Sequence, residues 1–149
     1  MRVLLQRVAE ASVRIDGECV GQCGRGLLLL VGVKCGDKPE DAEYLARKCL
    51  GLRIFEDEAG KMNLDLTDVG GTILAISQFT LYADARRGRR PSFVLAAPPQ
   101  ESEPLYELFV AKLREGGCHV ETGRFGADMK VSLVNDGPVT IMLDSDEMK

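Results

Sequence analysis

The chain has 149 residues, enough to bury a substantial core, and we expect a single domain spanning residues 1–149. A hydrophobic content of 45% and a charged content of 28% are ordinary for a soluble globular protein. The net charge of −4 argues against a protein that coats nucleic acid non-specifically, because such proteins are basic overall. A local basic site remains compatible with this charge.

The sequence shows no targeting or membrane signal. The longest purely apolar run, residues 27–31, is far too short to span a bilayer. Arg2, Gln6 and Arg7 interrupt the N-terminal apolar pattern, so there is no signal-peptide core. We therefore expect a cytoplasmic protein with no membrane partner. Its five cysteines are odd in number and form no C-x-x-C pair, which favours reduced thiols.

The single histidine, His119, restricts the chemistry that is possible. A two-histidine metal site is excluded, and a Ser-His-Asp triad would have to use this one residue. The sequence contains no EF-hand, Walker loop or dinucleotide-binding fingerprint. We expect neither a metal nor a cofactor.

The first half of the chain reads as strands followed by a helix. Residues 2–8 and 12–15 alternate as two strands before a turn at Asp16-Gly17, and the unbroken apolar run 27–33 is typical of a buried strand. Asp37, as a cap, and Pro39 open a helix that Gly51 closes. Its predicted inward face consists of Ala42, Leu45, Ala46, Cys49 and Leu50.

The second half adds strands around one more helix. Ser102 is the predicted cap of that helix, Gly116-Gly117 closes it, and the charged tail from Asp144 is expected to fray. Many antiparallel strands with two segregated helices predict an α+β domain with a mainly antiparallel, barrel-like sheet. The other expected segments are strands at 53–56, 72–82, about 118–122, 129–135 and 138–144, an irregular stretch at 63–71 and a long connection at 84–100.

The segment Asn135-Asp136-Gly137-Pro138-Val139-Thr140 is the most unusual part of the chain. Asp136-Gly137 is a strong turn pair and Pro138 cannot donate to a strand ladder, so we expect a hairpin turn. Gly137 tolerates backbone angles that other residues do not, and an X-Pro bond is where a cis peptide is accessible. The turn is therefore a candidate for presenting two carbonyls in unusual directions. A hairpin corner without chemistry is the alternative.

Two further stretches carry side chains suited to chemistry. In the strand 72–82, alternation places Ser77 and Phe79 on one face and Gln78 and Thr80 on the other. The two hydroxyls are candidate nucleophiles without an evident base, and ordinary strand hydroxyls are the alternative. A run of arginines suits phosphate binding, with a solvated basic loop as the alternative; it comprises Arg86, Arg87, Arg89 and Arg90.

Ser77-Gln78-Phe79-Thr80-Leu81 and the segment 135–140 together resemble the two signature motifs of the D-aminoacyl-tRNA deacylase (D-tyrosyl-tRNA(Tyr) deacylase) family. Residues 1–8, 90–93 and 123–130 also fit, so the resemblance covers essentially the whole chain. It implies hydrolysis of the ester that joins a D-amino acid to the terminal adenosine of tRNA. The implied catalytic region is Ser77, Gln78, Phe79 and Thr80, with Met129 lining the adenine pocket and the arginine run near tRNA phosphates.

The resemblance also implies a homodimer in which a cis Gly137-Pro138 pair reaches into the partner's pocket. Rigid carbonyls there would exclude an L-substituent at the α-carbon, which is specificity by exclusion. Glycine has no substituent to exclude, so glycyl-tRNA, such as glycine mischarged on tRNA(Ala), should also be cleaved. The 2′-hydroxyl of the terminal ribose can assist hydrolysis, while backbone N–H groups around Gln78 and Phe79 stabilise an oxyanion. A nucleophilic Thr80 ranks below this route because it has no visible activator.

Three other interpretations stay open on the sequence. A non-catalytic RNA-binding module would show salt-dependent binding without ester turnover. A serine or threonine esterase acting on small esters would form a covalent intermediate at Ser77 or Thr80 and ignore the tRNA. A purely structural dimerisation domain would leave the Gly137-Pro138 segment without a purpose.

Overall fold

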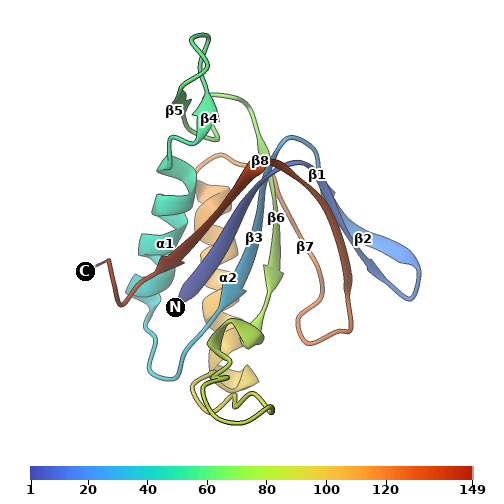
Figure 1. Ribbon diagram of the computed structural model, residues 1–149, viewed down its shortest axis with the longest axis vertical. Helices are drawn as coiled ribbons and strands as arrows, with labels where there is room; N and C mark the ends of the chain where they lie inside the picture. The colour runs from blue at the N-terminus through green and yellow to red at the C-terminus, as the bar shows by residue number, and fades with distance from the viewer. Residues whose placement is uncertain (149) are drawn as a thin grey trace.

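Two helices cover one face of a strongly curled sheet in the computed structural model, which describes residues 1–148 (Figure 1). This arrangement confirms the predicted α+β fold. None of the helices in that range is long and apolar enough to cross a membrane. The elements are β1 (Arg2–Ile15), β2 (Glu18–Cys23), β3 (Gly26–Gly32), α1 (Pro39–Gly51), β4 (Phe55–Glu56), β5 (Met62–Leu64), β6 (Thr72–Ser77), the 3₁₀ helix η1 (Phe79–Tyr82), α2 (Pro99–Glu115), β7 (Val120–Thr122) and β8 (Lys130–Asp144).

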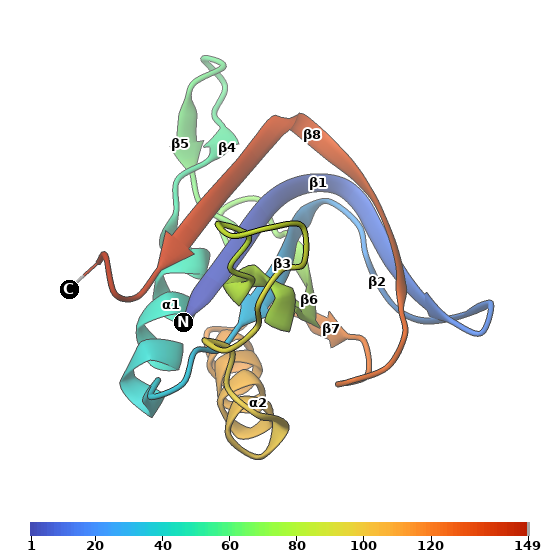
Figure 2. The same ribbon diagram turned by 60° about the horizontal axis from the view of Figure 1, so that its bottom comes forward.

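The sheet is organised around β1. This strand pairs antiparallel with β3 through residues 2–8 and with β2 through residues 11–15, while β8 pairs antiparallel along nearly its whole length. β6 adds to β3, and β7 to β6, in parallel. The curl visible in Figure 2 brings β2 towards β7, where the Gln22 N–H donates to Glu121 Oε1 at 3.0 Å. The result is an almost closed barrel.

Apolar side chains lie on both faces of this sheet. One buried cluster joins the sheet to α1 and α2 and includes Leu5, Leu29, Leu45, Phe109 and Leu113. A second, smaller cluster fills the inside of the curl and includes Val8, Val13, Leu28, Leu74 and Ile76. Each such side chain contributes about 1.5–3 kcal/mol when it leaves water. The curled sheet is therefore a rigid base for the segments at its edges.

The cysteines are free thiols, as predicted, and Cys49 packs in the larger cluster. Burial raises the pKa of the Cys23 thiol to about 11, and it also raises the pKa of Cys118. Both groups therefore stay protonated at neutral pH, when only a thiolate would be an effective nucleophile. Packing explains these residues better than catalysis.

Several predicted boundaries are wrong. Residues 2–15 form one strand rather than two, and the predicted strand 72–82 ends at Ser77, where the chain turns into η1. Helix α2 begins at Pro99 rather than after Ser102, because proline at the first helical position loses no hydrogen bond. Ser102 is instead buried within the first turns of α2. Lys38, not Asp37, is the N-cap of α1.

The chain after Asp144 is also better ordered than predicted. Asp144 ends β8, and its carboxylate accepts a hydrogen bond from Arg2 Nε at 2.9 Å. Burial raises the pKa of the Asp144 carboxyl, but hydrogen bonds from Arg2 and the Asp146 N–H outweigh it, so the net shift is downward. Ser145 is fully buried and donates its N–H to the Met1 carbonyl at 2.9 Å. These contacts tie the end of β8 to the start of β1.

Candidate active site

The segment predicted as a hairpin turn is a bulge inside the continuous strand β8. Gln6 pairs with Thr140 and Val8 pairs with Asn135, so four residues of β8 (136–139) lie opposite a single residue of β1, Arg7. The chain does not reverse, because both flanks of the bulge remain paired with β1. A bulge suits Pro138, which has no N–H to give to a ladder. The hairpin prediction, with separate strands at 129–135 and 138–144, is therefore wrong.

Hydrogen bonds close this bulge at its base. The Asn135 side chain donates to Thr140 Oγ1 at 2.8 Å and accepts from the Val139 N–H at 2.8 Å. Gly137 and Pro138 are exposed at its tip, and the peptide bond between them is cis. Gly137 has a φ of 140°, which L-residues rarely adopt. At Gly137 the tip therefore presents backbone without a side chain.

Arg7, on the neighbouring strand β1, holds the bulge through a hydrogen bond to its backbone. Its side chain is only 6% exposed, and it donates from Nε to the Asp136 carbonyl at 2.9 Å and from Nη1 to the Ile54 carbonyl at 2.7 Å. One planar guanidinium therefore links the bulge to the chain that follows α1. Because the fork geometry of this group is rigid, it restrains the position of the Asp136 carbonyl.

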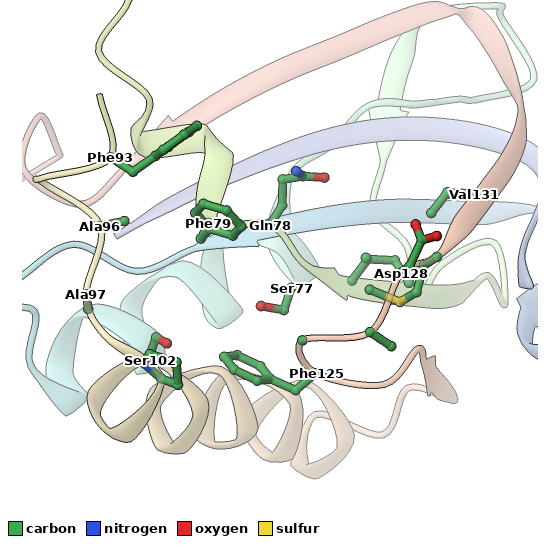
Figure 3. A pocket seen from close by; sticks show the side chains of 15 residues that line it. Ser77, Gln78, Phe79, Phe93, Ala96, Ala97, Ser102, Phe125, Asp128 and Val131 are labelled. Atoms are coloured by element: carbon green, nitrogen blue, oxygen red, sulfur yellow. The ribbon is translucent and has the colours of Figure 1, made fainter. Parts of the chain in front are cut away.

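A pocket of about 530 Å³ opens elsewhere on the curled sheet, within the range of small-ligand sites (Figure 3). Four of the predicted site residues line it, namely Ser77, Gln78, Phe79 and Met129. The remaining lining residues are Ile76, Phe93, Ala96, Ala97, Pro99, Ser102, Phe125, Gly126, Ala127, Asp128 and Val131. The pocket therefore lies between the end of β6, the first turns of α2, the chain before it and the loop before β8.

The turn into η1 brings three successive residues to the pocket. Strand alternation predicted Ser77 and Gln78 on opposite faces, but both line the pocket with Phe79 because the strand has ended. The Gln78 N–H donates to the Val31 carbonyl at 2.7 Å, which anchors this turn to β3. Figure 3 shows Ser77 between Phe79 and Phe125 in that view.

The other predicted site residues lie outside this pocket. Thr80 is exposed, and its hydroxyl is hydrogen-bonded to the Gln78 side-chain amide. Gly137 and Pro138, on the β8 bulge, do not line the pocket of their own chain. Within one chain, the two signature segments are therefore separate.

Among the lining residues that sequence reasoning did not identify, the aromatic and charged ones are Phe93, Phe125 and Asp128. Phe93 packs edge-to-face on Phe79, with ring centroids 5.2 Å apart. All three lie in segments that carried the family resemblance, Phe93 in 90–93 and Phe125 and Asp128 in 123–130, and this was the signal that could have identified them. Met129 fits because Gly123 has no side chain, since a Cβ there would collide with the Met129 sulfur.

Few ionisable side chains line the pocket. Asp128 is its one ionisable lining residue, and this side chain is 90% exposed and lies 3.4 Å from Lys130 Nζ. His119 contacts Glu121 at 2.9 Å and lowers the pKa of that carboxyl, and neither residue lines the pocket. Within residues 1–148, no group of histidine, cysteine and carboxylate side chains could hold a metal ion. Backbone groups, the hydroxyls of Ser77 and Ser102 and the Gln78 carboxamide are left as the uncharged polar groups of the site.

Comparison with known proteins agrees with this picture. A family model described as D-Tyr-tRNA(Tyr) deacylase matches residues 4–144. The D-aminoacyl-tRNA deacylase of Thermomicrobium roseum is 64% identical over 149 residues, covering 100% of this chain and 97% of that protein. The D-aminoacyl-tRNA deacylase of Halalkalibacterium halodurans is 59% identical over 145 residues, covering 97% of this chain and 99% of that protein.

Two solved structures share the fold. One, described as c-Myc DNA Unwinding Element Binding Protein, has a TM-score of 0.91 and 40% identity, covering 97% of this chain and 98% of that chain. The other, described as a probable eukaryotic D-amino acid tRNA deacylase, has a TM-score of 0.81, covering 95% of this chain and 97% of that chain. At 19% identity this second structure shows the fold alone. With the sequence matches, these findings confirm the resemblance seen in the motifs: the chain belongs to the D-Tyr-tRNA(Tyr) deacylase family and is a hydrolase of the aminoacyl-tRNA ester bond.

Proposed function

We propose that this chain removes D-amino acids from tRNA by hydrolysing the ester to the terminal adenosine, in a cytoplasmic proofreading role. The observation that carries this proposal is the pocket lined by Ser77, Gln78, Phe79 and Met129, which contains no histidine. A site without an imidazole base suits a substrate that supplies its own hydroxyl next to the ester. The 2′-hydroxyl of the terminal ribose is such a group.

The backbone provides a donor for the oxyanion. Of the two amides predicted for this role, the Gln78 N–H is already bonded to the Val31 carbonyl. The Phe79 N–H has no hydrogen bond to a protein acceptor within residues 1–148. We therefore assign the oxyanion contact to Phe79. Loss of one such donor typically costs about 10²–10³ in rate.

Chiral selection requires a second copy of the chain. Gly137 and Pro138 are exposed and are not among the residues that line the pocket of their own chain, so we infer that they meet the substrate in a partner's pocket. The same strand exposes Leu133, Val134 and Met142, with 36%, 50% and 48% of each residue accessible. Exposed apolar residues on an outer strand favour association with another molecule. A homodimer with Gly137-Pro138 acting in trans accounts for both features.

The proposed function is tested by following deacylation of D-tyrosyl-tRNA, L-tyrosyl-tRNA and glycyl-tRNA by the wild-type chain. Hydrolysis of the D-ester and the glycyl ester, with the L-ester spared, is the expected result. Equal rates on the D- and L-esters would leave a hydrolase without the exclusion mechanism. Absence of turnover on all three would favour the RNA-binding module.

Thr80→Ala is expected to keep hydrolysis of D-tyrosyl-tRNA within about tenfold of wild type, because an exposed hydrogen bond contributes only about 0.5–1.5 kcal/mol and about 1.4 kcal/mol corresponds to a factor of ten in rate. A D-tyrosyl 3′-ester on a terminal 2′-deoxyadenosine should instead react about 10²–10⁴ times more slowly, since it lacks the assisting hydroxyl. Single-turnover rates measured on both substrates check the two expectations together.

Thr80→Ser separates the two routes further. A nucleophilic hydroxyl would survive in this variant but not in Thr80→Ala, whereas both variants stay active if the substrate assists itself. Inactivity of a folded Thr80→Ala protein, with activity retained by Thr80→Ser, would establish the nucleophile.

A further inference from the structure

The arginines that follow η1 lie on a loop built next to the pocket. Asp84 and Ser92 pair through two backbone hydrogen bonds, of 2.7 Å and 2.8 Å, which close the loop at its base. The next residue, Phe93, lines the pocket. The loop lies below η1 in Figure 1. All four of its arginines are exposed, namely Arg86, Arg87, Arg89 and Arg90.

Arg86 differs from the other three. Its guanidinium donates to both carboxylate oxygens of Asp84, at 2.9 Å and 2.8 Å, and its backbone N–H donates to the same carboxylate at 3.1 Å. The Arg86 guanidinium lowers the pKa of the Asp84 carboxyl to about 2, so the pair remains ionised and locally neutral at physiological pH. Arg86 therefore shapes the base of the loop.

Arg87, Arg89 and Arg90 have no ion-pair partner in the part of the chain that the structure describes. Three guanidinium groups within four residues repel one another, and a polyanion relieves this repulsion. The chain as a whole carries a net charge of −4, so it does not attract a polyanion over its whole surface. The three arginines thus form a local positive patch beside the pocket.

We propose that Arg87, Arg89 and Arg90 bind backbone phosphates at the acceptor end of tRNA while its terminal adenosine occupies the pocket. This inference rests on the proposed function and assigns part of its substrate contact. The middle of the loop, Gly88, is four residues from its base at Asp84, a backbone span of at most about 14 Å, so the phosphates contacted belong to the last few nucleotides before the esterified adenosine. Phosphate contacts carry no sequence information, so the loop would position the acceptor end without selecting its sequence.

The proposal separates two substrates that share the same ester. D-Tyrosyl-tRNA presents the phosphates, whereas D-tyrosyl-adenosine presents only the group that enters the pocket. In the triple variant R87A/R89A/R90A, kcat/KM on D-tyrosyl-tRNA should fall about 10- to 100-fold at low salt, from the loss of up to three phosphate contacts. The value of kcat/KM on D-tyrosyl-adenosine serves as the reference. The measured quantity is therefore the ratio of kcat/KM on D-tyrosyl-tRNA to kcat/KM on D-tyrosyl-adenosine.

Binding of an uncharged acceptor minihelix gives a readout independent of hydrolysis. The dependence of log Kd on log salt should become shallower by about two to three units in the triple variant, close to one unit for each lost contact. The charge-matched control is R47A/K48A/K61A, which removes three exposed cations from α1 and the β4–β5 turn. This control should leave both the ratio of rates and the salt dependence unchanged.

Three results would overturn the proposal. An equal loss on the adenosine ester would show that the loop supports the pocket rather than the tRNA. An equal loss in the control variant would show a general charge effect. If the salt dependence of minihelix binding is the same in the triple variant as in the wild type, the three arginines do not contact phosphates. If the wild type cleaves neither ester, the proposed function fails, while minihelix binding still decides whether the loop holds phosphates.

Discussion

Arg7→Ala is expected to lower the free energy of unfolding by about 2–4 kcal/mol, because one buried and one partly buried carbonyl each lose a donor, worth about 1–3 kcal/mol at the buried one, and a cavity replaces the side chain. Those carbonyls belong to Ile54 and Asp136, at 2.7 Å and 2.9 Å from the guanidinium. Without this support the bulge that carries Gly137 is free to move, so hydrolysis of D-tyrosyl-tRNA should fall by at least about tenfold. Urea denaturation and single-turnover deacylation measure the two effects.

Gln6→Ala is the matched control for this prediction. Gln6 is the neighbour of Arg7 on β1 and also contacts β8, through a 3.4 Å hydrogen bond to Thr140 Oγ1, but this contact is exposed. Its loss should change stability by less than about 0.5 kcal/mol. Arg7→Lys should be intermediate, because a single ammonium lacks the fork that serves both carbonyls. If Arg7→Ala has the same urea midpoint as Gln6→Ala, the Arg7 side chain does not stabilise the bulge.

Most elements were predictable because their signals are local. The 3.6-residue spacing of Ala42, Leu45, Ala46 and Cys49 can be satisfied only by a helix with one buried face, and α1 has this form. The apolar run 27–33 likewise predicted β3, which is buried on both sides. In such segments the local pattern and the final packing agree, so the sequence alone is sufficient.

The bulge in β8 shows where local signals are not sufficient. Asp136, Gly137 and Pro138 are equally suited to a hairpin and to a bulge, because both need a break in the ladder and unusual backbone angles. Only the pairing of both flanks with β1 distinguishes them, and that pairing joins residues more than a hundred positions apart. A single sequence read in windows contains no direct record of such long-range register.

The candidate site was predictable in part for a related reason. Ser77, Gln78, Phe79 and Met129 came from motifs, and the structure brings these four together. Phe125 and Asp128 were missed because the pocket forms only when the end of β6, α2 and the loop before β8 meet in space. Strand alternation placed Thr80 on the same face as Gln78, but after the turn into η1 Gln78 lines the pocket and Thr80 does not.

Gly137→Ala is expected to lower the ratio of D- to L-tyrosyl-tRNA hydrolysis by at least about tenfold, equivalent to about 1.4 kcal/mol of lost discrimination. A Cβ there would lie 2.7 Å from Val139 Cγ2, 3.0 Å from Val139 N and 3.1 Å from Arg7 Nη2. These distances are too short, so the tip must shift, and the φ of 140° adds strain for any L-residue. In the proposed exclusion mechanism the L-substituent is rejected by carbonyls held in place, so displacement should slow the D-ester and admit the L-ester.

Gly17→Ala separates this effect from backbone strain in general. Gly17 also has a positive φ, of 80°, but it lies in the turn between β1 and β2, and an added Cβ there meets nothing within 4 Å. This variant should lose about 1 kcal/mol of stability and keep the wild-type ratio of D- to L-ester hydrolysis. If Gly137→Ala also keeps that ratio while both proteins remain folded, the tip does not select chirality. Selection would then have to come from the side chains that line the pocket, with Phe79 and Phe125 the first to replace.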